Sequence, residues 1–206
     1  MKRSIIIWPD PLLERPAQAI PMLSTTDGTT NLGQWTGQQA DDVRRLLDDM
    51  VETMIATRGA GLAAPQIGFG LRLAVVKVRV LPAPGAPQQA QTEEIVRLIN
   101  PEIVSREGVI TAKEGCLSFP GYTAEVKRSR WVRVRALDEN GCPIELEGDG
   151  QLAVALQHEL DHLDGVTMAT YLSPLKRNVV RASLVKRKRR GLRYVFDAPP
   201  AQDFTS

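Results

Sequence analysis

Apolar residues recur at helical spacing in one otherwise polar segment, DDVRRLLDDMVETMIATRG, residues 41–59. Acidic residues stand at its start and Gly59 follows its last apolar position, which are typical signals for the two ends of a helix. The positions that share one face are Val43, Leu46, Leu47, Met50 and Met54. The pattern predicts a helix whose apolar face packs into the core of the protein.

Shorter apolar runs predict β-strands. Three of these runs occupy residues 71–80, 95–104 and 108–115. The segment 131–148 alternates between apolar and polar residues on both sides of Asn140-Gly141, a pair that strongly favours the turn of a β-hairpin. A short apolar run near the start of the chain, which ends at Trp8, predicts one further strand.

Two more helices are predicted in the last third of the chain. The first lies between Asp149, which would act as its N-cap, and Gly165, which falls just past its end. The second opens with Ser173 and Pro174, a favoured pair for the N-cap and the first helical position. The predicted elements are one helix, then several strands, then two helices. This order predicts one α+β domain with a mostly antiparallel sheet.

Composition places the chain among ordinary globular proteins. It has 206 residues, of which 43% are hydrophobic and 24% charged, enough for one sizeable core. No apolar run approaches the roughly 18 residues that a membrane span needs, and the first run is too short for a signal peptide. We therefore expect a cytoplasmic protein with no membrane partner, and two cysteines do not indicate a disulfide scaffold.

Charge is distributed unevenly along the chain. The whole sequence carries a formal charge of +2, but residues 172–206 hold nine lysines and arginines against two aspartates. The stretch VKRKRR, residues 185–190, supplies five of these positive charges. An acidic body with a basic C-terminal part is a hint of a polyanionic partner.

The two histidines of the chain stand together in QHELDHLDG, residues 157–165. His158 and His162 are four residues apart, so a helix brings both to one face, where they can reach a single metal ion beside Glu159. A third ligand is needed, and neither a third histidine nor a glutamate after His162 exists. Asp164 is too close in sequence to fold back onto the same ion. The ligand is therefore expected upstream.

A cysteine thiolate is the next candidate for the third ligand. Cys116 lies in EGCLSFPG between two predicted strands, whereas Cys142 follows the Asn-Gly turn. Loop context favours Cys116 over Cys142 without excluding the latter. A Cys/His/His set leaves a fourth position for water, as in catalytic metal sites. Upstream, GAGLAAPQIG surrounds Gln66 with small residues, and its side-chain amide could donate to a developing oxyanion.

GAGLAAPQ, EGCLS and QHELDH, in that order, resemble the three signature motifs of peptide deformylase. The flanks IIIWPDPLL, INPEIV and DGVTMATYLSPLKR agree with the family as well, so the resemblance covers roughly residues 4–177. It implies an α+β fold with mostly antiparallel sheets around a central helix that carries the H-E-x-x-H motif, followed by a C-terminal helix. Residues 1–175 would form the catalytic domain, and residues 176–206 a basic helix and tail.

The family removes the N-formyl group from the initiator methionine of new polypeptides and releases formate. Carried over to this chain, the resemblance makes Cys116, His158 and His162 the metal ligands. Glu159 would serve as general base and then acid, while the Gln66 side chain and the Leu117 N–H hold the formyl oxygen. It also implies Glu114 as a structural partner of Arg128. The residues expected to contact the substrate are Ala60, Gly61, Gly115, Val154 and Ala155.

The resemblance implies one divalent metal ion, with Fe²⁺ expected in the cell, although the thiolate and imidazole ligands suit Zn²⁺ equally. Ala60 departs from the larger aliphatic residue usual at its position, which would widen the substrate cleft. N-formyl-methionyl nascent chains are the expected partners. The ribosome is a further candidate because basic residues 176–190 would bind its phosphates without taking part in the chemistry.

Two alternative functions remain open on the sequence. The first is a different metalloamidase or peptidase with the same three ligands, which activity on formyl-methionyl against unblocked peptides would separate. The second is a non-catalytic binding module associated with the ribosome. The presence of Glu159 and Gln66 argues against the second, because binding alone requires neither residue.

Overall fold

The computed structural model describes residues 1–21, 37–80 and 92–190 of the chain. Its α-helices are α1 (Gln38–Ala56), α2 (Gln151–Leu163) and α3 (Pro174–Arg189). Short 3₁₀ turns are η1 (Pro11–Glu14), η2 (Ala64–Ile67) and η4 (Met168–Tyr171). The strands are β1 (Gly61–Ala63), β2 (Leu73–Val80), β3 (Thr92–Glu107), β4 (Ile110–Gly115), β5 (Thr123–Arg128), β6 (Trp131–Leu137) and β7 (Pro143–Asp149).

The strands form two antiparallel sheets. The larger has the order β1-β2-β3-β6-β7, and the smaller consists of β4 and β5. The hairpin predicted around Asn140-Gly141 is confirmed, since β6 and β7 pair in unbroken register from Trp131↔Asp149 to Leu137↔Pro143. The expectation of a mixed fold with mostly antiparallel sheets and a C-terminal helix is also confirmed.

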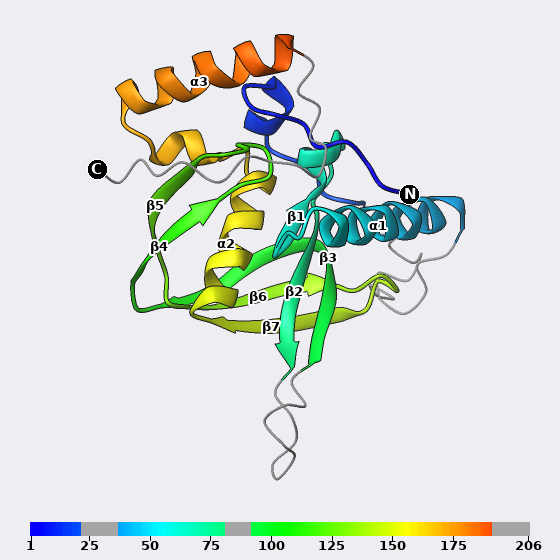
Figure 1. Cartoon of the computed structure of the whole chain (residues 1–206). Helices are drawn as coiled ribbons and strands as arrows, with labels where there is room; N and C mark the ends of the chain where they lie inside the picture. Colours follow the sequence, from blue (N-terminus) through cyan, green and yellow to red (C-terminus); the bar gives the residue numbers. More distant parts are fainter. Residues whose placement is uncertain (22–36, 81–91, 191–206) are drawn as a thin grey trace.

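Helix α2 passes between the two sheets (Figure 1) and contacts strands of both. Its Leu156 and Leu163 side chains are fully buried in a cluster with Ala63 of β1 and Val134 of β6. Strand β7 approaches the helix closely at Gly148, where a Cβ atom would lie 2.8 Å from Leu156 Cδ1. Only a glycine permits this approach, which sets the position of α2 on the large sheet.

Helix α1 confirms the first pattern read from the sequence. All five predicted stripe positions are buried, and they pack in the core with Leu62 of β1 and Val75 of β2. The helix begins at Gln38 and ends at Ala56, so it starts three residues before the predicted segment and ends before Gly59. The polar segment of residues 21–40, whose composition is typical of a loop, is therefore helical from Gln38 onward, and residues 22–36 lie outside the described residues.

The strand predicted near the N-terminus is wrong. The run is buried, but its backbone bonds singly to two separate segments: Ile6 N–H donates to Gln66 O at 2.7 Å, and Trp8 N–H donates to Ser118 O at 3.0 Å. A ladder with one partner strand therefore does not form. Trp8 also stacks on Phe119 with ring centroids 5.2 Å apart, so this segment ties together the loops that carry two of the three motifs.

The prediction of an Asp149 cap on α2 is also wrong, because Asp149 ends strand β7 opposite Trp131. Gly150 occupies the N-cap position with φ of 55° and offers no side-chain bond. A left-handed backbone at this point favours glycine and turns the chain from strand into helix. The Ser173 cap of α3 is confirmed, since its Oγ accepts a hydrogen bond from Lys176 N–H at 3.3 Å.

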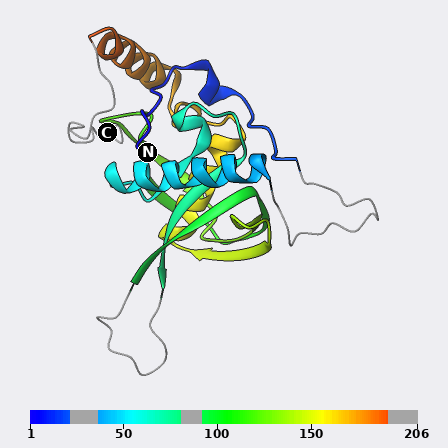
Figure 2. The same cartoon turned by 90° about the vertical axis from the view of Figure 1, so that its right-hand side faces the viewer.

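Helix α3 packs onto the body through Val180 and Leu184, both fully buried. Arg187 Nη1 donates to Pro120 O at 2.8 Å, and Lys188 lies 3.5 Å from Asp10 Oδ2. In Figure 2 the N-terminal segment runs beside this helix, as it does in Figure 1. None of the helices in the described ranges is both long and apolar enough to cross a membrane.

Candidate active site

Three possible metal ligands meet where α2 faces the loop after β4. Cys116 Sγ and one nitrogen of each histidine, His158 and His162, all lie within 4.8 Å of one another. Cys116 Sγ is 3.2 Å from His162 Nε2, and the two imidazole rings are edge to face with centroids 5.1 Å apart. The helical spacing of the histidines places both rings on the side of α2 that faces the thiol.

A carboxylate behind the possible ligands orients one imidazole. His158 Nδ1 lies 2.7 Å from Glu114 Oε2, so its Nε2 is directed toward the cysteine. Arg128 holds Glu114 in turn through two hydrogen bonds of 2.8 and 3.0 Å, which confirms the pairing expected from the sequence. Carboxylates that accept a bond from a ligating histidine commonly set its tautomer and ring orientation.

Arg128 joins this carboxylate to a wider hydrogen-bonded network that extends from the buried Glu114 to the exposed Tyr171. Its Nη1 donates to Asp161 Oδ2 at 2.6 Å and to the Tyr171 hydroxyl at 3.2 Å. Burial alone would raise the pKa of Glu114, but the hydrogen bonds from His158 and Arg128 hold that pKa below its usual value. Burial together with its bond to Asp161 raises the pKa of Tyr171 to about 12. Glu114 is therefore an anion at neutral pH.

Arg128→Met is expected to lower the free energy of unfolding by about 3–5 kcal/mol, because it leaves the buried Glu114 carboxylate without its cation. Both side chains are only 5% exposed. The matched control is Arg133→Met, which removes an ion pair to Glu147 whose side chains are 41% and 56% exposed, and should cost under about 1 kcal/mol. Urea denaturation at equal metal loading measures both. Equal losses in the two variants would contradict the buried-pair assignment.

Glu159 lies beside the ligands without belonging to their cluster. Its side chain is buried, and its Oε2 atom has no hydrogen-bond partner among the described residues. Burial, reinforced by the charges of Glu114 and Asp161 although opposed by His158, raises the pKa of Glu159 to about 7. A carboxyl with a pKa near neutrality can both accept and return a proton during a reaction.

Gly61 makes room for this carboxyl group. A Cβ atom at Gly61 would lie 2.5 Å from Glu159 Oε1 and 2.7 Å from its Cγ, closer than any real side chain is found. The sequence assigned Gly61 to substrate binding and missed this contact. The glycine-rich segment and the histidine motif, which are distant in sequence, are thus in contact. Strand β1 can pass over α2 at this point only because Gly61 has no side chain.

Gln66 is turned toward the thiol by its own backbone turn. Its Oε1 accepts a hydrogen bond from Ala63 N–H at 2.8 Å, and its Nε2 consequently faces Cys116 Sγ at 3.6 Å. The residue is 2% exposed, so the amide group is held in one orientation. Leu117 follows Cys116 directly and lines the same cleft.

These groups open into a cleft of about 450 Å³ between β1 and the β4–β5 sheet. Ten of the predicted site residues line it: Ala60, Gly61, Gln66, Gly115, Cys116, Leu117, Val154, Ala155, His158 and Glu159. His162 lies just behind them, 1% exposed. The sequence did not single out Arg58, Lys113, Phe119, Tyr122 or Gln151, which also line the cleft. These residues lie near the three motifs in the sequence, and this proximity could have identified them as cleft residues.

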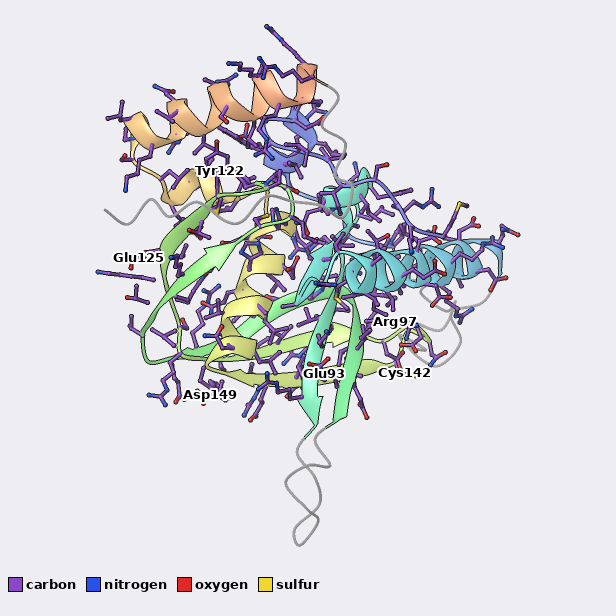
Figure 3. All side chains as sticks on the ribbon, viewed as in Figure 1. Glu93, Arg97, Tyr122, Glu125, Cys142 and Asp149 are labelled. Atoms are coloured by element: carbon purple, nitrogen blue, oxygen red, sulfur yellow. The ribbon has the colours of Figure 1, made fainter. Side chains whose placement is uncertain are left out.

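The second cysteine lies elsewhere. Cys142 is part of the β6–β7 turn, where its N–H donates to Asp138 Oδ1 at 2.8 Å. In Figure 3 it is well separated from Tyr122, which lines the cleft. The geometry therefore brings Cys116, and not Cys142, to the two histidines.

The residues at this site fit a divalent metal ion. A thiolate is a soft ligand that suits Zn²⁺ or Fe²⁺ together with imidazole, and three protein ligands leave a position for water or substrate. Burial lowers the pKa of His162 well below its ordinary value. Burial acts in the same direction on His158, but its hydrogen bonds to Cys116 and Glu114 raise the pKa of His158 well above the ordinary value, so a metal ion would have to displace its proton. A Cys/His/His cluster beside a buried glutamate, on an α+β fold, defines a metal-dependent hydrolase.

Comparison with known proteins identifies which hydrolase family this is. The chain belongs to the polypeptide deformylase family, whose sequence profile matches residues 2–178. It is 43% identical to a peptide deformylase of Alkalilimnicola ehrlichii over 187 residues, which cover 91% of each chain. A crystal structure of a peptide deformylase from Legionella pneumophila matches with a TM-score of 0.71 and 38% identity, over 93% of this chain and 98% of that one.

A second solved structure adds a ligand-bound relative. The peptide deformylase from Ehrlichia chaffeensis in complex with actinonin matches with a TM-score of 0.73 and 33% identity. The match covers 91% of this chain and 98% of the Ehrlichia chain. Agreement in sequence and in fold extends over nearly the whole length, so the family assignment does not rest on the three motifs alone.

Proposed function

We propose that this chain removes the N-formyl group from the initiator methionine of newly made polypeptides and releases formate, with α2 as the central helix that carries the catalytic motif. One observation supports the proposal: the Cys116/His158/His162 cluster, the Gln66 amide and a Glu159 carboxyl oxygen without a hydrogen-bond partner among the described residues lie together at the inner end of one cleft. Cys116, His158 and His162 are the proposed metal ligands. Residues 1–175 are the proposed catalytic domain.

A divalent metal bound there would lower the pKa of a water molecule and polarise the formyl oxygen. Glu159 accepts the proton of that water as its oxygen bonds to the formyl carbon. The Gln66 amide and the Leu117 N–H donate to the developing oxyanion, each worth about 3–4 kcal/mol in comparable hydrolases. Glu159 then returns the proton to the amine nitrogen as the C–N bond breaks, leaving formate and a free amino terminus.

The cleft suits a substrate that binds as an added strand. Strand β1 is the edge strand of the large sheet and pairs with β2. Its other edge pairs with no strand among the described residues, so a peptide backbone could add there. Ala60 and Gly61 lie on this side of the cleft and Gly115 on the β4 side. Val154 and Ala155 of α2 line the floor, where they would contact the methionine side chain. The small Ala60 side chain leaves the cleft wide.

Fe²⁺ is the proposed metal in the cell, and the cytoplasm, where formyl-methionyl chains are made, is the proposed location. Support for the metal is the mixed thiolate and imidazole ligand set, which suits Fe²⁺ as well as Zn²⁺. Metal analysis of protein purified without oxygen would distinguish the two. A zinc content near one per chain under those conditions would reject iron.

A formate-release assay tests the proposed function. The metal-loaded protein should hydrolyse a formyl-Met-Ala-Ser peptide and leave the acetylated and unblocked forms of the same peptide intact. Cleavage of an internal peptide bond would instead indicate a peptidase with the same ligands, and no turnover with intact metal would indicate a binding module. Actinonin, which is bound to the Ehrlichia chaffeensis relative, should inhibit the reaction.

The basic segment of residues 176–190 is proposed to add affinity for the ribosome. The end of helix α3 exposes Lys186 and Arg189 together with the C-cap residue Arg190. Clustered cations bind the phosphates of RNA through counterion release. Truncation after Lys176 would not test this role cleanly, since it removes the buried side chains of Val180 and Leu184. Variants that change only exposed charges avoid this problem.

The triple variant Lys186→Gln, Arg189→Gln and Arg190→Gln is therefore expected to reduce co-sedimentation with ribosomes at low salt by about 10-fold or more. Formate release from a free tripeptide should remain near wild type, because these residues lie outside the cleft. The matched control is Arg106→Gln, Lys127→Gln and Arg130→Gln, which removes three exposed charges elsewhere. Equal ribosome binding by both triple variants would reject the role of α3.

A further inference from the structure

The outer part of the cleft has one sign of charge. Its exposed charged residues are Arg58 and Lys113, both basic. The two acidic residues that line the cleft, Glu114 and Glu159, are buried at its inner end, where the proposed chemistry uses them. A substrate that enters the cleft therefore passes two cations and meets no exposed carboxylate among the described lining residues.

The two cations stand on different walls. Arg58 follows α1 and precedes β1, and its backbone N–H donates to Ile55 O at 3.1 Å. Its φ of 55° places it in the left-handed region, so the chain turns sharply there before it enters the cleft wall. Lys113 lies on β4, on the exposed face that alternates with buried Ala112 and Glu114.

The direction of the substrate follows from burial. Beyond Gly61, the residues Leu62 and Ala63 are completely buried, so a peptide bound along β1 cannot continue inward. It must leave past Ala60 toward Arg58. On the opposite wall of the cleft, a substrate that leaves in this direction passes Cys116, then Gly115 and then Lys113.

The distances along the chain match a short peptide. Arg58 is three residues before Gly61, and Lys113 is three residues before Cys116. On the β4 side the backbone is extended as far as Gly115, and three extended residues span about 10 Å, which is the reach of the second and third substrate residues when formyl-methionine occupies the inner end. On the β1 side Arg58 lies within that distance of Gly61, because the chain bends at Arg58. Side chains of those residues therefore come level with the two cations.

We propose that Arg58 and Lys113 make this cleft selective for formyl-methionyl peptides with an acidic side chain at the second or third residue. The inference rests on the proposed deformylase function and specifies its substrate class. Arg58 contributes the larger share, because Lys113 lies opposite Glu125 in the β4–β5 register and part of its field is cancelled there. Both cations act in solvent, so salt weakens the preference.

The test compares formyl-Met-Asp-Ala, formyl-Met-Asn-Ala and formyl-Met-Lys-Ala, and the same three side chains at the third position. At low salt kcat/KM should be about 5–10-fold higher for the better aspartyl peptide than for its lysyl counterpart, the range expected for two exposed charge pairs. The difference should reside in KM, since the contact is equal in the ground and transition states. It should shrink towards unity in about 0.5 M salt.

The variants Arg58→Glu and Lys113→Glu should each reduce the ratio, and the double variant should invert it. The matched control, Arg106→Glu, reverses an exposed arginine outside the cleft and should keep the wild-type ratio. Equal kcat/KM for the three peptides, or a preference that survives the double reversal, would overturn this inference while leaving deformylation intact. Absence of formate from every peptide would instead count against the proposed function itself.

Discussion

Glu159→Gln should reduce formate release by at least about 10⁴-fold while the metal stays bound. A group that serves first as base and then as acid contributes at or above the top of the usual 10²–10⁴-fold range. Glu159 lies next to the proposed ligand His158 but outside the Cys116/His158/His162 cluster. Glutamine has nearly the same shape, so the clearance above Gly61 is kept and only the capacity to carry a proton is lost.

Metal content and formate release must be measured on the same preparation. Glu147→Gln, which changes an exposed carboxylate on β7, is the matched control and should behave like wild type in both. Turnover near the wild-type rate in metal-loaded Glu159→Gln would refute the mechanism. Loss of metal together with activity would instead make Glu159 a ligand.

Cys116→Ser should remove most of the bound metal and with it the activity. Changes to residues that merely support a ligand weaken metal affinity by about 10–100-fold, so loss of the thiolate itself should exceed that range. The structure places Cys116 Sγ 3.2 Å from His162 Nε2 and within reach of the Gln66 amide. A serine hydroxyl at the same place is a harder and far less acidic donor.

Cys142→Ser is the natural control, because it makes the same chemical change at the β6–β7 turn. Its metal content and formate release should equal those of the wild type. Metal content and formate release, measured in parallel on the two variants, decide which cysteine is the metal ligand. A metal-free Cys142→Ser and a metal-loaded Cys116→Ser would reverse the ligand assignment.

Local patterns were sufficient for the elements that depend on local interactions. The stripe from Val43 to Met54 predicts α1 because helical periodicity is a property of neighbouring residues, and all its positions are buried. Asn140-Gly141 predicts the β6–β7 hairpin for the same reason. Ser173 predicts the start of α3, since a cap bonds to a backbone N–H three residues away.

Patterns failed where a segment depends on distant partners. The run around Ile6 and Trp8 has the composition of a strand, yet its N–H groups bond to Gln66 and Ser118, far away in sequence. Asp149 has the side chain of a cap but is drawn into β7 by its pairing with Trp131. In both cases tertiary hydrogen bonds outweighed local preference.

The sequence by itself determined the chemistry available to this protein: two histidines one helical turn apart, a glutamate beside them, a cysteine in a loop and a single amide among small residues. These are choices of functional group and local spacing, which need no fold to be recognised. Only the tertiary structure decided how they act together. Gly61 leaves space for Glu159, and Arg58 and Lys113 line the same cleft. Residues so far apart in sequence become neighbours only when β1, β4 and α2 pack together, because packing brings surfaces together irrespective of their order along the chain.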